Sequence, residues 1–409
     1  MSDFTARPAP EHAAGPPVAL IVSRCTWTLW VFRRPLIDAL RRAGWRVIAV
    51  GGSTGDFDAK LRAAGIELAC IPLSPRGTSP FSELRTFLAL VRLFRRHRPL
   101  LVHTFTIKPT LYGRWAARLT SVPVVVSKIT GLGHVFVAEG MRARIMRGAV
   151  RHGYRLAFRH PRSAATFENP DDMAVLQQAA VLGPTRAVVI RGSGVDVEAF
   201  RTSPEPAGTP IVVLVARLIW EKGVAEFVAA ARILKDRGLP ARFALVGGSD
   251  FGNPNAVPQA TLTAWLADGV VEHWGYAEDV AAVYRKCTLV CLPSYREGLP
   301  RSLLEAAASG RAIVTTDVPG CREIVHHGDN GLLVPAKDAV ALAAALAALL
   351  ESPQKRQRMA AAGRQRVLDH FAQEIVLSRT FALYRELGLP VPSADHLGDD
   401  APAAAATSA

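Results

Sequence analysis

The chain of 409 residues is 49% hydrophobic and 21% charged, a composition that excludes a disordered protein and allows two domains with separate cores. The 49 lysines and arginines outnumber the 35 aspartates and glutamates, and the net charge of +14 indicates an anionic partner: nucleic acid, an acidic membrane surface or a phosphorylated small molecule. Five cysteines without a CxxC pair favour a reducing compartment over a disulfide framework or a zinc site.

The sequence contains no segment that we expect to enter or cross a membrane. At the N-terminus, acidic residues and prolines precede only a short apolar run, which does not make a secretory signal. The longest stretch of alanine and leucine, residues 341–350, is about half of the roughly 20 residues that a membrane-spanning helix needs. Any contact with a membrane is therefore expected at its surface.

Short apolar runs followed by helical patterns recur along the chain, as is typical of parallel strands buried on both faces. The first series lies at residues 18–24, 46–52, 100–105, 122–130 and 187–193. After the proline-rich residues 201–210 the rhythm restarts with IVVLVARL, RFALVGG, VVEHWGY, TLVCLPS, AIVTTDV and GLLVP. From residue 340 to about residue 389 the pattern is helical.

This order of elements predicts an α/β protein with two doubly wound Rossmann-like domains that face each other across a cleft, followed by C-terminal helices. We expect the domains at residues 1–203 and 204–390, and a disordered tail at 391–409. Ligands of such folds bind outside the carboxyl ends of the strands, so the loops that follow the strands are the candidate sites.

The stretch YREGLPRSLLEAAASG predicts a helix whose N-terminus binds an anion. Pro300 suits the first turn of a helix and Gly310 its end, so we expect a helix of about residues 300–309. The backbone N–H groups of Gly298, Leu299 and the first helical turn would then point toward a phosphate at the end of the preceding strand.

Upstream, the segment ARLIWEKG delivers two cations, Arg217 and Lys222, to the end of the first strand of the second domain. Two positive charges that face a helix N-terminus suit a diphosphate better than a single phosphate. The alternative is that both are surface charges, with Lys222 paired to Glu221 or Glu226.

Two glutamates lie beside this expected anion site. Glu305 is expected at the edge of the cleft, where a carboxylate can accept two hydrogen bonds from the hydroxyl groups of a ribose. Glu297, nearer the phosphate, can accept a hydrogen bond from a hydroxyl group of whatever the phosphate carries. The alternatives are an exposed ion pair of Glu305 with Arg301 and simple solvation of Glu297.

REGLPRSLLEAAASG resembles the E-x7-E signature of the retaining family 4 glycosyltransferases of the GT-B fold, and ARLIWEKG, VGGSD, VVEHWGY and TTDVPGCREIVHHGDNGLLVP fall in the order of that family. The resemblance covers the second domain. It implies that Glu305 binds the ribose of a nucleotide and that Glu297 binds the transferred sugar. It also implies that Arg217 and Lys222 bind the diphosphate and, with Glu297, form the catalytic set.

Two stretches of the first domain, VHTFTIKPTLYG and SKITGLGHVF, resemble a bacterial branch of this family that extends polyprenyl-diphosphate-linked sugars in the assembly of surface polysaccharides or glycans. By this resemblance we expect four residues on the acceptor side: His103, Lys108, Gly131 and Gly133. For His103 the alternative is a strand-end histidine with satisfied hydrogen bonds. The loop after the first strand lacks the glycine pair of many relatives, and Thr130 or Gly131 stands where many have a histidine.

The resemblance implies a metal-independent, retaining hexosyltransferase without a cofactor. It would move an N-acetylated hexosamine or a hexose from a UDP-sugar or GDP-sugar to a polyprenyl-diphosphate-linked saccharide. Retention would follow from front-face attack, in which the leaving phosphate helps to deprotonate the acceptor and Glu297 only positions the sugar. Cations with helix amides can stabilise the leaving group, so no magnesium clamp is expected.

Three other classes of protein fit the sequence less well. A nucleotide-sugar epimerase of the GT-B type shares the expected architecture, but the acid and base residues that it needs cannot be assembled from this sequence. A nucleic-acid-binding protein would explain the charge, yet no nucleic-acid module is recognisable. No strand is followed by G-x-G-x-x-G, which disfavours a nicotinamide enzyme.

A basic helical stripe is expected at residues 141–162. It contains Arg144, Arg147, Arg151, Arg155 and Arg159, beside an apolar side with Ile145, Met146, Val150, Tyr154 and Phe158. Together with RLFRRHR at 92–98, it predicts that the chain is cytoplasmic and lies peripherally on the anionic inner face of the cell membrane. The alternative is a solvated helix whose apolar side packs on its own sheet.

Overall fold

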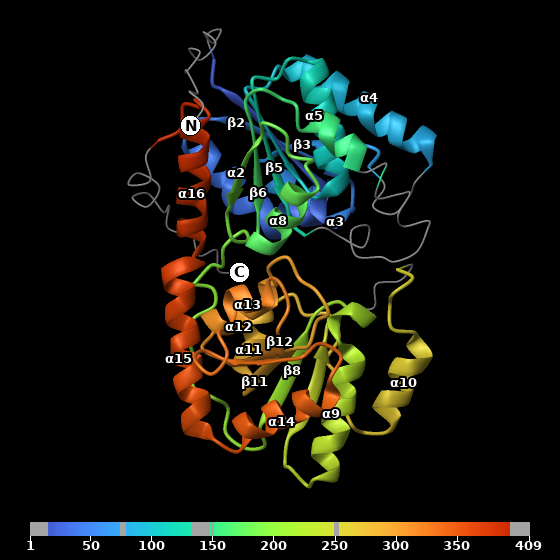
Figure 1. The fold of residues 1–409 in the computed structure, drawn as a ribbon, viewed down its shortest axis with the longest axis vertical. Coiled ribbons are helices and arrows are strands. Elements are labelled where there is room, and N and C mark those ends of the chain that lie inside the picture. The colour runs from blue at the N-terminus through green and yellow to red at the C-terminus, as the bar shows by residue number, and fades with distance from the viewer. Residues whose placement is uncertain (1–14, 74–78, 132–147, 149–150, 249–252, 393–409) are drawn as a thin grey trace. The chain divides into compact units, whose positions relative to one another are not determined.

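The computed structural model describes residues 15–73, 79–131, 148, 151–248 and 253–392. The chain divides into two compact units, Met1–Ser193 with Glu374–Ala409 as the first and Gly194–Gln373 as the second (Figure 1). Of the tail predicted at 391–409, Val391 is buried in the core of the first unit, and the part from residue 393 onward lies outside the described residues, as does Gly133.

The first unit is built on a parallel sheet of seven strands. They are β1 (Val18–Cys25), β2 (Arg46–Gly52), β3 (Glu67–Cys70), β4 (Leu101–Phe105), β5 (Val124–Ile129), β6 (Ser163–Phe167) and β7 (Arg186–Val189). Their order in the sheet is β3-β2-β1-β4-β5-β6-β7. Each apolar run predicted as a strand in this part forms one, which confirms those predictions. The pattern missed β3, a short edge strand, and β6, a buried strand rich in small residues.

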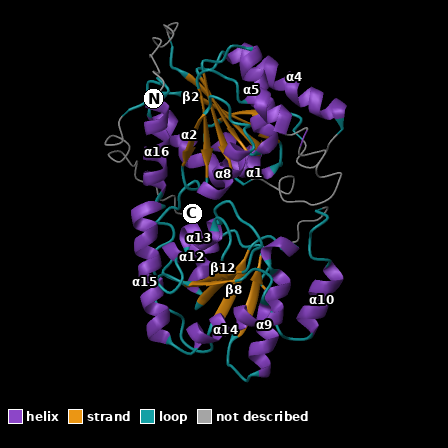
Figure 2. Cartoon of the chain, in the orientation of Figure 1, coloured by secondary structure: helices purple, strands orange, loops and turns teal. Residues whose placement is uncertain are grey.

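Helices cover both faces of this sheet (Figure 2). They are α1 (Thr26–Thr28), α2 (Arg34–Arg42), α3 (Asp56–Ala63), α4 (Pro80–His97), α5 (Ile107–Leu119), α8 (Pro170–Gln178) and α16 (Gln373–Glu386), with a π-helical turn η1 (Leu29–Arg33) between α1 and α2. Alternate residues of β1 enter two cores, because successive strand side chains point to opposite faces. Ile21 packs in the core of α2 and α16, and Val22 in that of α4 and α5.

The last helix, α16, belongs to the first unit, which differs from the predicted domain 204–390 that holds all terminal helices. Phe381 and Tyr384 of α16 are buried in the same core as Ile37 of α2. The periodicity of an apolar helix face predicts burial but not which sheet receives it, and this explains the difference.

The second unit has a parallel sheet of six strands. They are β8 (Ile211–Val215), β9 (Arg242–Val246), β10 (Glu272–His273), β11 (Leu289–Leu292), β12 (Ala312–Thr316) and β13 (Leu332–Val334), in the order β10-β9-β8-β11-β12-β13. Every apolar run predicted here forms a strand. The helices are α9 (Val224–Asp236), α10 (Gln259–Ala267), α11 (Val280–Arg285), α12 (Arg301–Ala308), α13 (Cys321–Ile324), α14 (Ala339–Leu350) and α15 (Pro353–His370).

In both sheets the first strand of the unit lies in the interior, with the next strands in sequence on one side of it and the later strands on the other. β1 lies between β2 and β4, and β8 lies between β9 and β11. Loops that leave the carboxyl ends of such neighbouring strands run to opposite faces of the sheet, and doubly wound proteins bind their ligands there. The fold therefore directs attention to the loops after β1 and β4 in the first unit, and after β8 and β11 in the second.

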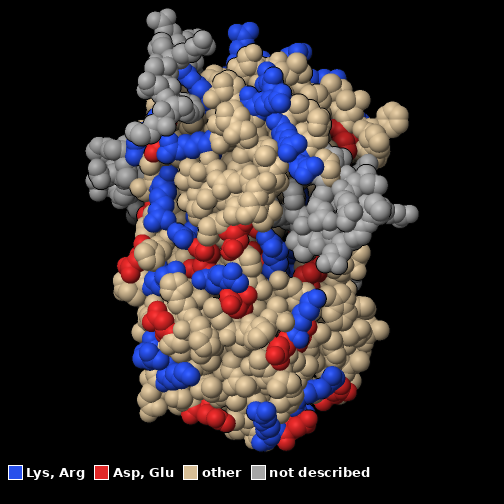
Figure 3. All heavy atoms as spheres, viewed as in Figure 1, with Lys and Arg blue, Asp and Glu red and all other residues tan. Residues whose placement is uncertain are grey.

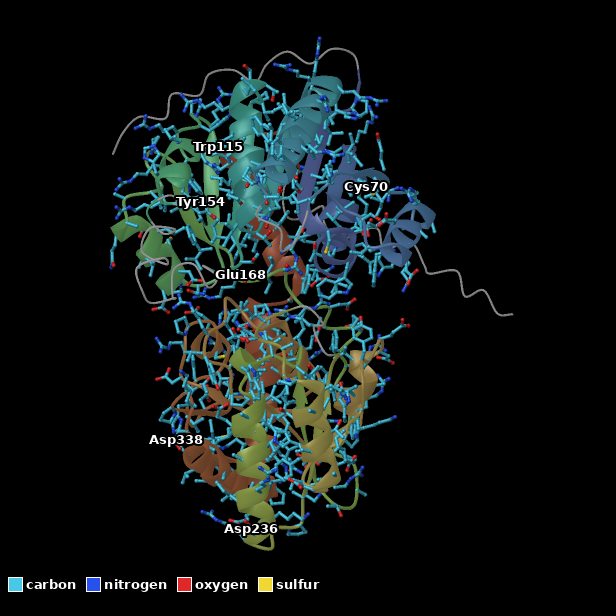
Figure 4. The ribbon with its side chains drawn as sticks, turned by 90° about the vertical axis from the view of Figure 1, so that its right-hand side faces the viewer. Cys70, Trp115, Tyr154, Glu168, Asp236 and Asp338 are labelled. Carbon is cyan, nitrogen blue, oxygen red and sulfur yellow. The ribbon has the colours of Figure 1, made fainter. Side chains whose placement is uncertain are left out.

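Within the described ranges, no helix is long and apolar enough to cross a membrane. Lys and Arg side chains gather on the visible face of the first unit, with few acidic ones among them (Figure 3). The expected basic stripe at 141–162 is described almost only from residue 151 onward, and its described arginines, Arg151, Arg155 and Arg159, are exposed. Tyr154, labelled in Figure 4, and Phe158 are buried in the core of the first unit. For these two residues, this confirms the alternative that the apolar side of the helix packs on its own sheet.

Loops at the carboxyl end of the second sheet pack against each other through glycines. Gly247, directly after β9, has a φ of +145°, and a Cβ atom there would lie 1.8 Å from the carbonyl oxygen of Ala216. Gly223 has a φ of +72°, and its Cβ position is 2.0 Å from the carbonyl oxygen of Pro293. No side chain fits at either place without moving the backbone, so these glycines set the spacing of the loops.

We predict that Gly247→Ala destabilises the second unit by at least about 2 kcal/mol, because its methyl group clashes with the backbone and its φ is strained for alanine. The melting temperature of this unit should fall by about 4–8 °C in thermal unfolding. Gly248→Ala is the matched control, since nothing lies within 4 Å of its Cβ position. Equal melting temperatures for the two variants would contradict the close-contact argument.

Candidate functional site

The loop between β8 and α9 carries both predicted cations of the second unit. Arg217 follows the end of β8 by two residues and is exposed. Lys222 ends a short 3-10 turn, and Gly223 then adopts a left-handed conformation from which α9 begins. The side chain of Lys222 is only 20% exposed, because it contacts the loop that follows β11.

Glu297, in the loop between β11 and α12, is the partner of Lys222. Its Oε1 atom accepts hydrogen bonds from the Lys222 ammonium group and from the Ser294 hydroxyl group, the latter at 2.7 Å. The Glu297 side chain is 10% exposed, so the pair is largely shielded from water and simple solvation of Glu297 is excluded. Shielding and the extra hydrogen bond hold these charges in a more defined geometry than an exposed ion pair would have.

The alternative partners of Lys222 are engaged elsewhere. Glu221 accepts a hydrogen bond from the side-chain amide of Asn255, and Glu226 accepts one from the Tyr295 hydroxyl group at 2.7 Å. The Tyr295 backbone N–H also donates to the carbonyl oxygen of Glu221 at 2.9 Å. Pairing of Lys222 with a neighbour in its own segment is therefore wrong, and the loops after β8 and β11 share one network.

Helix α12 agrees closely with the expected helix of residues 300–309. Pro300 is the residue just before the helix rather than its first residue, and Leu299 buries its side chain in the core. Gly320, in the loop after β12, packs on Gly298. A Cβ atom on Gly320 would lie 2.5 Å from the carbonyl oxygen of Gly298. The loops after β8, β11 and β12 thus converge at the start of α12.

Glu305 is buried, whereas we expected it at the exposed edge of a cleft. The Nε atom of Arg301 donates to its Oε1 atom at 2.6 Å, so the ion pair considered as an alternative exists, although its carboxylate is not exposed. Burial raises the pKa of Glu305, and Arg301 only partly offsets this effect. A ribose that binds this carboxylate has to compete with Arg301 for it.

The predicted acceptor-side residues of the first unit have separate surroundings. His103 is buried within β4, and its Nδ1 atom lies 2.6 Å from the hydroxyl oxygen of Tyr384. Lys108, in the first turn of α5, forms an ion pair with Glu83 of α4 at 2.6 Å. Gly131 follows β5 with a φ of +121°, a conformation that suits glycine.

Arg33 and Lys128, two of the buried cations of the first unit, were missed in the sequence. Lys128 is the one charged residue in the apolar run 122–130, and this could have identified it, because lysine is seldom buried without a specific partner. Arg33 stands in an arginine-rich stretch and offers no such signal.

Two protein-family models match most of the chain. Residues 28–191 match the glycosyl transferase 4-like domain, and residues 196–366 match the glycosyl transferases group 1. A curated relative, the N,N'-diacetylbacillosaminyl-diphospho-undecaprenol alpha-1,3-N-acetylgalactosaminyltransferase of Campylobacter jejuni, is 28% identical over 370 residues, which cover 87% of this chain and 95% of the relative. The capsular polysaccharide biosynthesis glycosyltransferase CapM of Staphylococcus aureus is 21% identical, over 78% of this chain and 85% of the relative.

Solved structures show the same fold. Sucrose-phosphate synthase from Thermosynechococcus elongatus matches with a TM-score of 0.76 at 23% identity, over 91% of this chain and 99% of that one. Anabaena HepE in complex with UDP-glucose matches with a TM-score of 0.72 at 20% identity, over 89% and 99%. The chain therefore belongs to the family 4 glycosyltransferases of the GT-B fold, which confirms the fold class and the family predicted from its motifs.

We predict that Glu305→Gln leaves the ligand-free protein at least as stable as the wild type near neutral pH. Because the folded-state pKa of Glu305 is raised, its ionisation lowers the stability of the folded protein, increasingly as the pH rises from about 4.3 through the folded-state pKa. Glutamine carries no charge and can still accept a hydrogen bond from Arg301.

Thermal unfolding at about pH 4.5 and about pH 7.5 measures this effect. The melting temperature of Glu305→Gln relative to the wild type should be higher at the upper pH than at the lower one. Glu278→Gln, at an exposed glutamate of the same unit, is the control and should show no such dependence. If Glu305→Gln melts well below the wild type at both pH values, the carboxylate stabilises the ligand-free protein and the argument is wrong.

Proposed function

We propose that the protein transfers a sugar from a nucleoside-diphosphate sugar, held by the loops of the second unit, to a lipid-linked saccharide with retention of configuration. The observation that carries this proposal is the shielded Lys222–Glu297 pair at the start of α12. A sugar diphosphate presents the complementary groups, because its anionic oxygens suit the cation and the helix N-terminus and its hydroxyl groups suit the carboxylate.

In this proposal Arg217 and Lys222 bind the diphosphate, together with the backbone of Gly298 and Leu299. Cations held in place before the reaction stabilise the negative charge that develops on the leaving diphosphate. When the diphosphate binds Lys222, the ion pair between Lys222 and Glu297 weakens. Glu297 then accepts hydrogen bonds from the transferred sugar. Its role is to position the sugar for attack.

Retention is proposed to follow from attack on the same face that the diphosphate leaves. The leaving phosphate accepts the proton of the acceptor hydroxyl group, so no side chain is assigned as a general base. Glu305 accepts hydrogen bonds from the ribose after displacing Arg301. No metal is assigned a role, since Arg217 and Lys222 supply the positive charge at the leaving diphosphate.

The likeness to the Campylobacter transferase supports the finer choice of substrates. Its name gives a diphospho-undecaprenol-linked acceptor and a transferred N-acetylgalactosamine, and the match extends over most of both chains. We therefore propose a polyprenyl-diphosphate-linked saccharide as acceptor and an N-acetylated hexosamine or hexose as the transferred group. UDP is the preferred carrier, ahead of GDP.

The test is a transfer assay with purified protein, a panel of UDP- and GDP-sugars and a lipid-linked saccharide. We expect nucleotide release that depends on the acceptor, persists in EDTA and yields a product with the anomeric configuration of the donor. A GT-B epimerase, the second candidate, would convert the sugar without an acceptor and leave the nucleotide attached. Inversion of the anomeric configuration would disprove retention, and complete loss of activity in EDTA would disprove metal independence.

Variants in the same assay separate the proposed roles. Lys222→Met should lower turnover by ~10²-fold, because a preorganised charge is lost from the leaving-group site. Glu305→Gln should mainly raise the donor KM, and Glu297→Gln should mainly lower kcat. Lys286→Met removes an exposed lysine of the same unit and should leave the kinetics unchanged.

Helix α4 of the first unit has a surface suited to an anionic membrane. Phe81, Leu84 and Leu88 are 81%, 53% and 38% exposed, and they lie at helical spacing on one face. The same face continues in exposed arginines: Arg85, Arg92, Arg95 and Arg96. Glu83, the one acidic residue of α4, is paired with Lys108. Apolar side chains next to exposed cations are typical of helices that lie on an acidic bilayer, where a polyprenyl-linked acceptor would be found.

We predict that the protein sediments with anionic but not with neutral vesicles and is released by high salt, since each cation near an acidic leaflet contributes about 1 kcal/mol. Changing Phe81, Leu84 and Leu88 together to Ser should leave most of the protein in the supernatant. The control changes three exposed apolar residues elsewhere to Ser: Leu119, Tyr276 and Val340. If both triple variants sediment like the wild type, α4 does not dock the protein on the bilayer.

A further inference from the structure

A small pocket opens in the first unit at the carboxyl end of its central strands. His103 and Phe105 of β4, Lys128 of β5 and residues of α16 line it, and half-buried Phe32 and Ser193 bring it to the surface. Its volume of about 30 Å³ exceeds the roughly 10–15 Å³ that one water molecule needs. Phe105 and Lys128 are paired in the β4–β5 register, so their side chains lie on one face of the sheet.

Arg33 enters this pocket from the π-helical turn η1. It lies in the buried stripe between Leu29 and Leu36, where an amphipathic helix would carry an apolar residue. Its guanidinium group donates to Ser193 Oγ at 2.6 Å and lies 4.0 Å from the centre of the Phe105 ring. π-helical turns are frequent at functional sites, and this one holds a charge inside the domain.

Lys128 adds a second buried charge. Its ammonium group donates to the carbonyl oxygens of Ile190, at 3.1 Å, and Gly192, and a third donor remains. Burial lowers the pKa of Lys128 to about 8; Glu168, labelled in Figure 4, opposes this shift and Arg33 adds to it. Arg33 and Lys128 thus place two buried basic groups at the wall of the pocket.

His103 supplies the observation that points to a ligand. Its Nε2 atom is buried and has no hydrogen-bond partner in the part of the chain that the structure describes, although its Nδ1 atom contacts Tyr384. A buried polar atom without a partner costs free energy, so folded proteins retain few of them. Burial, with Lys128 and Arg33 nearby, lowers the pKa of His103 well below its usual value, and a neutral ring can donate from Nε2 when Nδ1 accepts from Tyr384.

We propose that this pocket binds a phosphate group, whose oxygen atoms accept hydrogen bonds from His103 Nε2 and Lys128 Nζ beside the Arg33 guanidinium group. The described residues that line the pocket include these three basic side chains and no Asp or Glu. A phosphate oxygen can accept a hydrogen bond from His103 Nε2, and the phosphate also brings negative charge beside Lys128 and Arg33. A water molecule can accept the hydrogen bond but brings no charge. The phosphate belongs either to the diphosphate of a lipid-linked acceptor, which rests on the function proposed above, or to a free phosphate ion.

The test is thermal unfolding of the full-length protein with inorganic phosphate at constant ionic strength. Saturating UDP occupies the loops of the second unit, so a phosphate effect there is suppressed. We expect phosphate to raise the melting temperature of the wild type by about 2–4 °C. Lys128→Met and His103→Leu should lose this shift, and Lys60→Met, at an exposed lysine of α3, should keep it.

His103→Gln guards against variants that fail to fold, because it keeps a nitrogen near the Nε2 position and should retain part of the shift. The same shift in Lys128→Met and in the wild type would overturn the proposal, and so would no shift in the wild type. Farnesyl diphosphate identifies the source: a larger shift than with inorganic diphosphate assigns the pocket to the acceptor, and an equal one to free phosphate. Failure of UDP to stabilise the protein would count against the proposed function alone.

Discussion

Close backbone contacts between loops determine where the charged groups of the second unit lie. Gly223 meets Pro293, and Gly247 meets Ala216, at distances that leave no room for a Cβ atom. The loops therefore cannot shift independently, and Lys222 stays paired with a glutamate 75 residues away in the chain. Groups that are fixed before a ligand arrives need little reorganisation when charge develops on that ligand, which is the main requirement for electrostatic catalysis.

The loops around α12 and the pocket of the first unit accommodate buried charge in different ways. In the second unit the shielded carboxylates of Glu297 and Glu305 each have a basic partner. In the first unit, Arg33 rests on an aromatic ring and a hydroxyl group, and Lys128 on carbonyl oxygens. Dipoles and π-systems compensate a buried cation less completely than a carboxylate does, so an anion bound beside Arg33 and Lys128 would add to their compensation.

Much of this structure could be predicted from the sequence, because buried parallel strands leave apolar runs and helix ends leave proline and glycine. The limits of α12 and the meeting of the loops that carry Lys222 and Glu297 followed from such local signals. The partner of Lys222 could not be predicted from the sequence, because Glu221 and Glu226 are nearer in the chain than Glu297. Only the packing of the loops selects Glu297. The inward side chain of Arg33 depends on a π-helical turn, which leaves no pattern in the residues.

The position of α16 has a consequence for biosynthesis. The chain completes the strands of the first unit, continues through all of Gly194–Gln373, and only then supplies the helix that buries Phe381 and Tyr384 against the first sheet. At translation rates of about 5–20 residues per second, the ribosome needs roughly 10–40 s to make the intervening unit. During that time the first unit lacks part of its core and exposes apolar surface, which chaperones recognise. The second unit, continuous in sequence, can fold first, and the surroundings of His103 are completed last.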